Sequence, residues 1–265
     1  MNKENLIYLE NVSVNYGEFN ALKNINLCIN SGENWAIMGA NGSGKSTLVK
    51  LFTNDLYPYA NEDFKKVFFN KERWDIFELK KNFGIVTDTI QQDFIRNSKD
   101  TTIEEVILSG YYSALGVYKI HNFTNEQLQK AKEVLKFLEI YDIKEKPVST
   151  LSTGILRRAI IGRAMIQNPK IFVLDEPTSG LDMKAKSNFI KIIRKLAEKF
   201  TIILITHDIE EIFPEITNIA LIKDKTIFKQ GEKEEVLTSK NISDVFNVKA
   251  QLHKKDSSYF VEIFE

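Results

Sequence analysis

This chain of 265 residues has one cysteine, five prolines and no formal net charge. Its one cysteine, Cys28, excludes an internal disulfide framework and fits a reducing cytosol, and we expect it to pack as a small hydrophobic side chain. Lys and Arg together number 36, as do Asp and Glu, so the formal net charge is zero. That balance argues against binding nucleic acid through bulk charge, and we expect no nucleic-acid partner.

Long hydrophobic runs are also missing. None approaches the roughly 20 apolar residues that span a bilayer. Residues 1–16 lack the apolar segment and the cleavage site of a signal peptide. We therefore expect a soluble chain that reaches a membrane only through a partner protein.

Short apolar runs alternate with amphipathic segments along most of the chain. Buried strands are predicted at residues 35–38, 83–86, 171–174, 202–205 and 219–222, and helices at 45–52, 125–138, 155–166 and 184–200. This alternation predicts an α/β fold with a mostly parallel sheet, whose ligands bind beyond the carboxyl ends of the strands. Gly39, Asp88, Asp175 and His207 each follow a predicted strand closely, so we expect one site among them.

Two segments depart from this alternation. Residues from about 89 to 150 are predicted to be a mainly helical insertion, with a capping box formed by Thr124 and Gln127. The helix that follows is expected to bury one stripe of side chains: Leu128, Ala131, Leu135 and Leu138. From about residue 231 the pattern is mixed, which indicates a C-terminal extension.

A glycine-rich phosphate loop follows the strand predicted at residues 35–38. It matches GxxxxGK(S/T) between a strand and a helix, and its residues are Gly39, Ala40, Asn41, Gly42, Ser43, Gly44, Lys45, Ser46 and Thr47. The glycines let backbone N–H groups turn toward phosphates, and the helix N-terminus adds positive potential. Lys45 is expected to reach the β- and γ-phosphates of ATP, and the Ser46 hydroxyl to bind Mg²⁺.

Three further residues are expected to take part in hydrolysis. Asp175 follows the apolar run at residues 171–174 and is expected to bind Mg²⁺. Glu176 is placed to polarise the attacking water or to accept its proton. His207 follows the apolar run at 201–206, and we interpret it as a contact to the γ-phosphate. The chain is accordingly predicted to be an ATPase.

The order of these motifs resembles that of ATP-binding cassette (ABC) ATPases, over nearly the whole chain. GANGSGKST resembles the Walker A loop, LSTG at residues 151–154 the signature loop, and IFVLDEP at 171–177 the Walker B strand. Residues 179–182 resemble the D-loop and His207 the switch histidine. Tyr16 matches the aromatic residue that stacks on adenine, although a strand aromatic in the core is the alternative interpretation.

The resemblance implies an architecture and an assembly. It implies a P-loop NTPase core with an antiparallel β subdomain, as one ATP-binding domain over residues 1–265, with a helical subdomain at about 89–156 and an extension at about 231–265. Two copies are expected to form a head-to-tail dimer around two ATP molecules. Ser152 and Gly154 would contact the γ-phosphate of the partner's nucleotide, and Asp182 would lie at the interface. ATP would close the dimer, and hydrolysis would reopen it.

Two positions differ from the family pattern. Ile155 stands where Gln or Glu usually follows the signature glycine, which either weakens ATP-driven closure or leaves that contact to the backbone. Asp88 stands where the Q-loop glutamine usually follows its strand, and Gln91 comes slightly later. We favour Asp88 as the residue at the site, where it would bind Mg²⁺. The alternatives are a longer loop that brings Gln91 inward, or a solvated Asp88.

Local similarities predict a transport function. Residues 84–94 and 106–118 resemble a subgroup of ABC ATPases associated with molybdate or iron-complex transport, and residues 234–248 resemble importer ATPases for iron chelates or cobalamin. The predicted function is therefore the ATP-hydrolysing subunit of an importer, peripheral at the inner face of the cell membrane through separate permease subunits. Five residues would either dock a permease or pack within the insertion: Tyr111, Tyr112, Leu115, Val117 and Tyr118. A soluble ABC ATPase without a permease, or a regulatory ATP-binding module, is the alternative, and the sequence does not specify the cargo.

Overall fold

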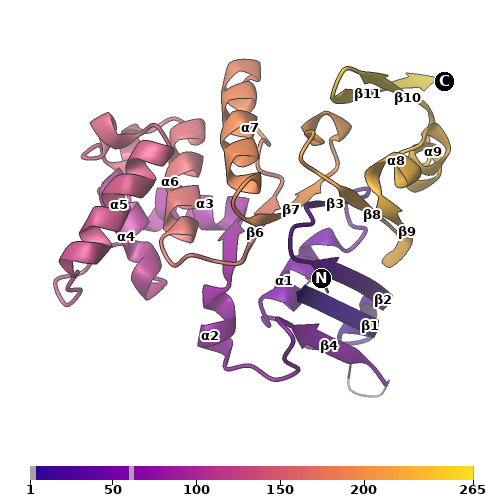
Figure 1. Ribbon diagram of the computed structural model, residues 1–265, viewed down its shortest axis with the longest axis horizontal. Helices are drawn as coiled ribbons and strands as arrows, with labels where there is room; N and C mark the ends of the chain where they lie inside the picture. The colour runs from indigo at the N-terminus through magenta and orange to yellow at the C-terminus, as the bar shows by residue number, and fades with distance from the viewer. Residues whose placement is uncertain (1–3, 60–62, 265) are drawn as a thin grey trace. The chain divides into compact units, whose positions relative to one another are not determined.

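The computed structural model describes residues 4–59 and 63–264, and Figure 1 labels most of their helices and strands. The chain divides into two compact units, which are described separately. Unit 1 is Met1–Lys80 with Ala197–Glu265, and unit 2 is Lys81–Leu196. Unit 1 contains most of the strands and unit 2 most of the helices. Within the described ranges, no helix is both long and apolar enough to cross a membrane.

Unit 1 begins with an antiparallel sheet in the order β2-β1-β4. Its strands are β1 (Asn5–Tyr16), β2 (Phe19–Asn30) and β4 (Lys65–Phe68). Along β2 the side chains of Ile25, Leu27 and Ile29 are buried, because alternate residues of a strand face the same side. Cys28 lies between two of them and is exposed, so the prediction that it packs as a core residue is wrong.

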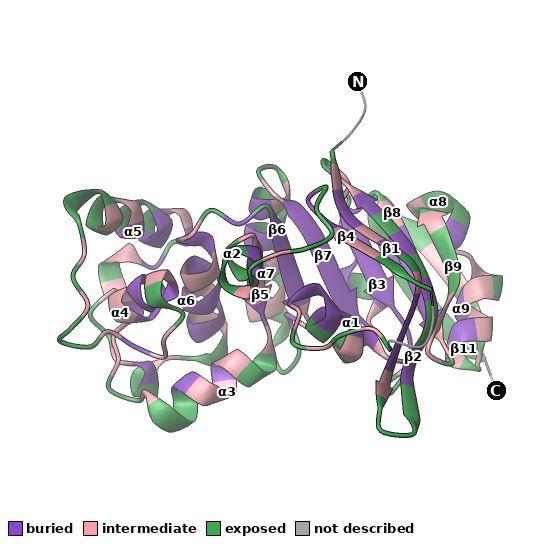
Figure 2. Cartoon of the chain, turned by 90° about the horizontal axis from the view of Figure 1, so that it is seen from below, coloured by how far each residue is buried: buried purple, intermediate pink, exposed green. Residues whose placement is uncertain are grey.

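A second group of strands in unit 1 has the order β7-β3-β8-β9, with β9 antiparallel to β8 and the others parallel. They are β3 (Trp35–Met38), β7 (Thr201–Thr206), β8 (Asn218–Lys223) and β9 (Thr226–Glu232). β3 lies between two strands and is buried throughout (Figure 2). Met38 is paired with Thr206, so the chain leaves β3 and β7 at the same edge, where Gly39 and His207 follow.

One buried side chain connects these parallel strands near their opposite ends. Asn34, just before β3, accepts a hydrogen bond from the N–H of Ile202 at 2.8 Å. Its Nδ2 donates to the carbonyl oxygens of Ala197 and Glu215 at 3.4 and 3.1 Å. A buried amide with satisfied hydrogen bonds helps to define one arrangement of its neighbours. Asn34 thereby helps to set the register in which the phosphate loop and His207 leave the sheet.

The other elements of unit 1 are α1 (Lys45–Phe52), α2 (Ile76–Lys81, which ends at the unit boundary), η4 (Ile209–Glu211), α8 (Lys233–Val236), α9 (Ser239–Phe246) and the hairpin of β10 (Lys249–Lys255) and β11 (Ser258–Phe264). Glu234 of α8 accepts hydrogen bonds from Lys254 Nζ at 3.0 Å and Tyr259 Oη at 2.9 Å. The Lys254 bond is the main cause that lowers the pKa of Glu234. These contacts attach the C-terminal hairpin to α8.

Unit 2 has a parallel strand pair and a group of helices. Its elements are β5 (Phe83–Val86), α3 (Asp88–Asn97), α4 (Ile103–Leu108), η1 (Ser109–Tyr112), α5 (Asn125–Phe137), η2 (Tyr141–Ile143), η3 (Val148–Thr150), α6 (Thr153–Met165), β6 (Ile171–Asp175) and α7 (Met183–Ala197). Val86 is paired with Leu174, so the chain leaves β5 and β6 at one edge. Parallel strands alternating with helices confirm the predicted α/β class.

The helix α5 tests the sequence pattern in the insertion. The capping box between Thr124 and Gln127 is confirmed, with the two reciprocal hydrogen bonds at 3.2 and 2.9 Å. Ala131 and Leu135 are buried as predicted. Leu128 is 43% exposed, so the predicted stripe is wrong at its first residue. Leu128 lies in the first turn of α5, at the N-terminal end of the stripe.

Candidate active site

The phosphate loop of unit 1 has no room for a side chain at two of its glycines. A Cβ on Gly39 would lie 2.3 Å from the carbonyl oxygen of Ile222 in β8 and 2.8 Å from Ser43 Oγ. Gly44 has φ +114°, and a Cβ there would lie 2.7 Å from Leu22 Cδ2 in β2. Only glycine fits both positions, so the loop backbone packs directly against β8 and β2.

Two side chains inside this loop are buried. Lys45 is 6% exposed, and its Nζ donates to the carbonyl oxygens of Gly39 at 2.7 Å and Ala40 at 3.1 Å. The Ser43 hydroxyl oxygen is buried without a hydrogen-bond partner in the described part of the chain. A buried hydroxyl is costly unless something supplies that partner. The loop therefore fits an anion such as phosphate, which the Ser43 hydroxyl would contact.

The start of α1 fits the cation that accompanies a nucleotide. Gly44 is the N-cap residue of α1, so the loop runs directly into the positive end of the helix. Ser46, in the first turn, is exposed, and Thr47 is half-buried. The Ser46 hydroxyl is therefore accessible to a hard cation such as Mg²⁺, which prefers oxygen ligands.

Tyr16 and His207 are the other predicted site residues in unit 1. Tyr16 ends β1 at the turn into β2 and is 45% exposed, so the alternative of a core aromatic is wrong. β2 contains Leu22, which lies against Gly44, and thus joins the Tyr16 turn to the phosphate loop. His207 is exposed directly after β7. The phosphate loop and His207 follow neighbouring parallel strands, as the sequence predicts.

The predicted acidic residues lie in unit 2, at the end of β6. Asp175 is the last residue of the strand and is half-buried. Glu176 follows with φ +46°, a left-handed conformation that is uncommon for residues other than glycine. The N–H of Ser179 donates to the Glu176 carbonyl oxygen at 3.2 Å and closes a turn. Such strained residues cluster at functional sites, which supports a functional interpretation of Glu176.

A buried arginine connects this turn to the start of α3 within unit 2. Arg157 of α6 is 5% exposed, and its Nε donates to Gln91 Oε1 and its Nη1 to the Pro177 carbonyl oxygen, both at 2.8 Å. Its Nη2 lies 3.6 Å from Asp88 Oδ1. Because the guanidinium is planar and its donors have fixed directions, these contacts define the spacing between Asp88 and the turn after Glu176.

Asp88 and Gln91 differ in their surroundings. Asp88 is the first residue of α3 and its side chain is 61% exposed. Gln91 lies one turn later, is 3% exposed, and has its carbonyl group bound by Arg157. The amide of Gln91 is therefore engaged inside unit 2, whereas the carboxylate of Asp88 remains accessible. The sequence pattern did not predict this arrangement, because Arg157 is 66 residues from Gln91.

The signature loop begins α6. Ser152 caps the helix and accepts a hydrogen bond from the N–H of Ile155 at 3.4 Å. A Cβ on Gly154 would have Ala185 Cβ as its nearest described neighbour, at 3.7 Å, which is an ordinary contact distance. Asp182 is exposed and caps α7 by accepting from the N–H of Ala185 at 2.8 Å. Packing within unit 2 therefore explains Asp182 as a helix cap but does not require glycine at position 154.

Comparison with known proteins decides the family. Residues 22–179, more than half of the chain, match the family model described as "ABC transporter". The chain belongs to the ABC transporter family. It is an ATP-binding subunit of that family, which confirms the resemblance inferred from the sequence.

Three relatives of this ABC subunit show how far the similarity extends. The ABC transporter ATP-binding protein ModF of Escherichia coli is 34% identical over 209 residues, which are 76% of this chain and 39% of ModF. The zinc uptake system ATP-binding protein ZurA of Listeria innocua is 30% identical over 236 residues, 88% of either chain. The structure of CbiO1 from Clostridium perfringens, part of the ABC transporter complex cbiONQ, has a TM-score of 0.76 at 29% identity and covers 91% of this chain and 94% of its own. These matches confirm the predicted P-loop fold of ABC ATPases.

Proposed function

We propose that this ABC subunit hydrolyses ATP and couples the closure of a dimer to a separate membrane permease, as part of an importer. The phosphate loop supports the proposal best. Its backbone packs too closely for side chains at Gly39 and Gly44, and the buried Ser43 hydroxyl has no partner in the described residues. A loop that acted only as a turn would need neither feature. The relative ZurA, named for a zinc uptake system, supports import as the direction.

The chain's own residues would divide the work of hydrolysis. Tyr16 stacks on the adenine, and the phosphate loop binds the phosphates. The Ser46 hydroxyl and the Asp175 carboxylate would hold Mg²⁺, which would neutralise charge on the phosphates. Glu176 accepts the proton of the attacking water, and His207 contacts the γ-phosphate. In place of the Q-loop glutamine we propose Asp88, since its carboxylate is exposed while Gln91 is bound to Arg157.

The signature loop is proposed to serve the nucleotide of a second subunit. A Cβ at Gly154 has space in its own chain, and the backbone there is not left-handed. Neither packing nor conformation within one subunit therefore requires glycine. A phosphate approaching from outside would require it, because a bare backbone lets N–H groups come close to an anion. Ile155 has no polar side chain, so the backbone of this turn and the Ser152 hydroxyl would supply the contact.

Substitution of Gly154 separates binding from dimer closure. Gly154→Ala is expected to leave ATP affinity of the single subunit unchanged, because the added methyl group fits its own chain. ATP-dependent dimers should be lost, because the methyl group would stand between the backbone and the partner's nucleotide. Light scattering after size exclusion, in a Glu176→Gln background that prevents turnover, measures the dimer. Binding of a fluorescent ATP analogue measures affinity.

Gly39→Ala is the matched control for this experiment. Its Cβ has no room against Ile222, so this variant should lose ATP binding itself, unlike Gly154→Ala. A Gly154→Ala protein that forms ATP-dependent dimers as readily as the wild type would contradict the proposed contact between subunits.

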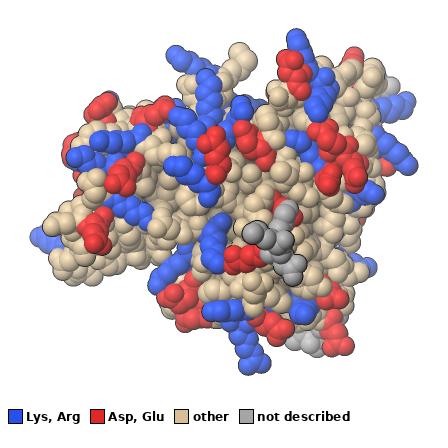
Figure 3. Space-filling model, in the orientation of Figure 1, with Lys and Arg blue, Asp and Glu red and all other residues tan. Residues whose placement is uncertain are grey.

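An exposed aromatic cluster of unit 2 is the surface we propose for the permease. Tyr112, Tyr118 and Ile120 are 43%, 57% and 82% exposed. His121 stacks on Tyr112 with ring centroids 3.9 Å apart and meets Tyr118 edge-on at 5.4 Å. Ordered aromatic side chains at the surface are typical of protein interfaces. On the face seen in Figure 3, acidic and basic side chains are interspersed, which suits a protein partner better than a nucleic acid.

Removal of this aromatic surface should uncouple the subunit from membranes. Tyr118→Ser combined with Ile120→Ser is expected to abolish co-purification with membrane proteins, while the isolated subunit keeps its ATPase rate. Phe228→Ser, which removes an aromatic residue that is 42% exposed on β9, is the control and should co-purify normally. A wild-type subunit that never associates with membranes would instead favour the soluble ATPase without a permease.

A further inference from the structure

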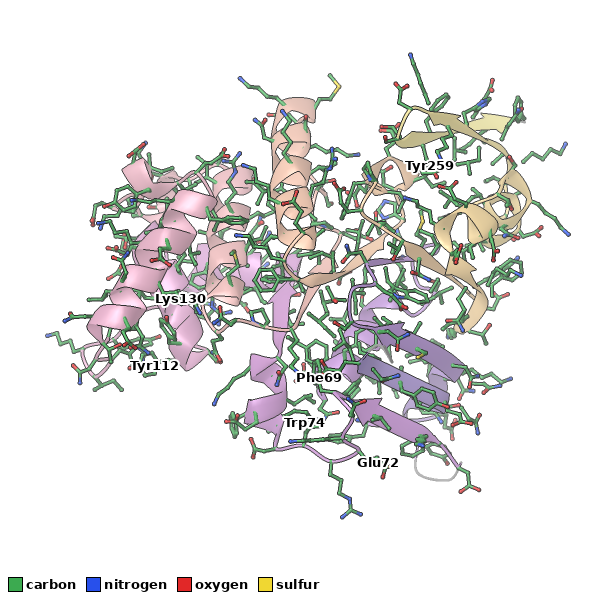
Figure 4. The ribbon with its side chains drawn as sticks, in the orientation of Figure 1. Phe69, Glu72, Trp74, Tyr112, Lys130 and Tyr259 are labelled. Atoms are coloured by element: carbon green, nitrogen blue, oxygen red, sulfur yellow. The ribbon has the colours of Figure 1, made fainter. Side chains whose placement is uncertain are left out.

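A pocket of about 520 Å³ lies beside β4 in unit 1 and contains no residue of the phosphate loop. Four aromatic and three cationic side chains line it, against a single carboxylate from Glu72. Figure 4 shows Trp74 and Glu72 in this part of unit 1, with Phe69 close to Trp74. The pocket is large enough for a small ligand, and its lining carries more positive than negative side chains.

Lys66 occupies a position of β4 where the strand pairing predicts an apolar residue. It is paired with Leu9, and Phe68 is paired with Ile7. Leu9, Ile7 and Phe68 are all 2% exposed or less. Directly paired residues share a face of the sheet, so Lys66 lies on the buried face. Its ammonium is 5.5 Å from the ring centroid of Phe68 and 5.0 Å from that of Tyr57.

The charge of Lys66 is not balanced by a protein carboxylate. Its Nζ donates to Asn54 Oδ1 at 2.5 Å, and no carboxylate among the described residues lies within ion-pair distance of it. Burial lowers the pKa of Lys66 to about 8, with no opposing contribution from an acidic neighbour. Partial burial of an unpaired cation is costly, and a bound anion would provide the pair.

We propose that this pocket binds a small planar organic anion, an aromatic ring bearing a carboxylate or phosphate group. Lys66 would bind the acidic group, assisted by Arg73 at the rim, and the ring would lie against Trp74. Trp74 is already fixed, because its indole N–H donates to the Phe68 carbonyl oxygen at 2.9 Å and its ring packs edge-on against Phe69 at 5.7 Å. A fixed ring in a pocket lined by cations recognises shape and charge together.

Protection of a strand edge is the other role that this lysine could serve. β4 is an edge strand, and inward-pointing charges on edge strands prevent pairing with other chains. Such a lysine needs neither a pocket nor a fixed ammonium. Lys66 has both, since Tyr57 and Asn54 contact its ammonium within an aromatic pocket. The two roles predict different results in a binding experiment, because a lysine that only protects the strand edge does not bind an anion.

The indole N–H of Trp74 provides a reporter for the test. The chain has two tryptophans, so its ¹H–¹⁵N spectrum has two indole resonances, which the Trp74→Phe variant assigns. Benzoate and phenyl phosphate are titrated against their neutral counterparts benzamide and phenol, with ADP present to fill the phosphate loop. We expect saturable shifts of the Trp74 resonance with the anions and none with the neutral molecules. Whichever of benzoate and phenyl phosphate binds more tightly shows whether the pocket prefers a carboxylate or a phosphate group.

Variants show whether Lys66 is responsible. Lys66→Gln should weaken anion binding roughly tenfold or more, because a hydrogen bond from a charged donor is lost. Arg73→Gln, at the exposed rim, should weaken it about two- to fivefold and cannot disturb the core. Lys240→Gln, which removes the same charge from the exposed face of α9, should leave the affinity unchanged.

The pH dependence gives a second measurement on the wild type. Affinity should be full well below pH 8, where Lys66 is charged, and should fall as the pH rises through about 8. This dependence should disappear in Lys66→Gln, which separates Lys66 from the other charged or titratable groups that line the pocket: Lys65, Glu72, Arg73 and Tyr57. Absence of a saturable shift with either anion, or equal affinity in Lys66→Gln, would overturn the proposal. Oligomers of a Lys66→Val protein, with no anion bound by the wild type, would establish edge protection instead.

Discussion

Glu176→Gln is expected to stop steady-state ATP hydrolysis while ATP binding and dimer formation persist. The amide has the size of the carboxylate but cannot accept a proton from water, and loss of a general base typically costs a factor of about 10²–10⁴ in rate. Gln replaces Glu without new strain, because both side chains face the same cost at φ +46°. Phosphate release measures the rate, and light scattering with ATP measures the dimer.

Glu198→Gln is the control for this substitution. Glu198 is exposed and follows α7, so the same chemical change there should leave the rate within twofold of the wild type. A Glu176→Gln protein that hydrolyses ATP at the wild-type rate would contradict the role assigned to Glu176. One that remains monomeric with ATP would contradict the mechanism of two subunits around shared nucleotides.

Arg157→Met is expected to lower the free energy of unfolding by about 2–4 kcal/mol and to reduce turnover as well. Methionine fills part of the space but leaves Gln91 Oε1 and the Pro177 carbonyl oxygen without their buried donor, and each unsatisfied group costs about 1–3 kcal/mol. Turnover should fall because the turn after Glu176 loses its connection to α3. Urea unfolding measures the stability, and phosphate release measures the rate.

Substitutions of Asp88 and Gln91, the two residues of α3 that contact Arg157, provide the comparison for Arg157→Met. Gln91→Ala should reproduce part of the stability loss, about 1–3 kcal/mol, because it removes the acceptor of the buried Nε–H of Arg157. Asp88→Ala should change stability by no more than about 0.5 kcal/mol, because its side chain is 61% exposed, yet it should alter the Mg²⁺ dependence of turnover. Normal Mg²⁺ dependence in Asp88→Ala, with lost turnover but normal stability in Gln91→Ala, would assign the Q-loop role to Gln91.

The features that follow from short stretches of sequence were predictable. Gly39 to Lys45 form a loop because the order of glycines, lysine and hydroxyl is itself the requirement for cradling phosphate. α1 has the bounds 45–52 expected from its pattern, and β3 and β5 match the predicted runs at 35–38 and 83–86. The alternation of Ile25, Leu27 and Ile29 was also available in the sequence, and it would have placed Cys28 on the solvent side.

Other features depend on contacts between distant parts of the chain. Arg157 has acceptors 66 residues before it and 20 residues after it, which no periodic pattern reveals. The inward position of Lys66 depends on its pairing with Leu9 across β1 and β4, and its neighbours at residues 65–68 suggest no such burial. The left-handed conformation of Glu176 is likewise imposed by the turn that follows β6, not by its residue type. Tertiary structure therefore decides which charged side chains are buried.

Cys28 on the outer face of β2 would make the proposed approach of two subunits measurable in the natural sequence. One accessible thiol per chain takes one dye or nitroxide at a known place, and a pair of subunits then contains two identical probes. Burial and the nearby Glu33 raise the pKa of this thiol, so labelling should proceed faster in mildly alkaline buffer than at neutral pH. The distance between the probes would follow each cycle of approach and separation, without any cysteine having to be added or removed.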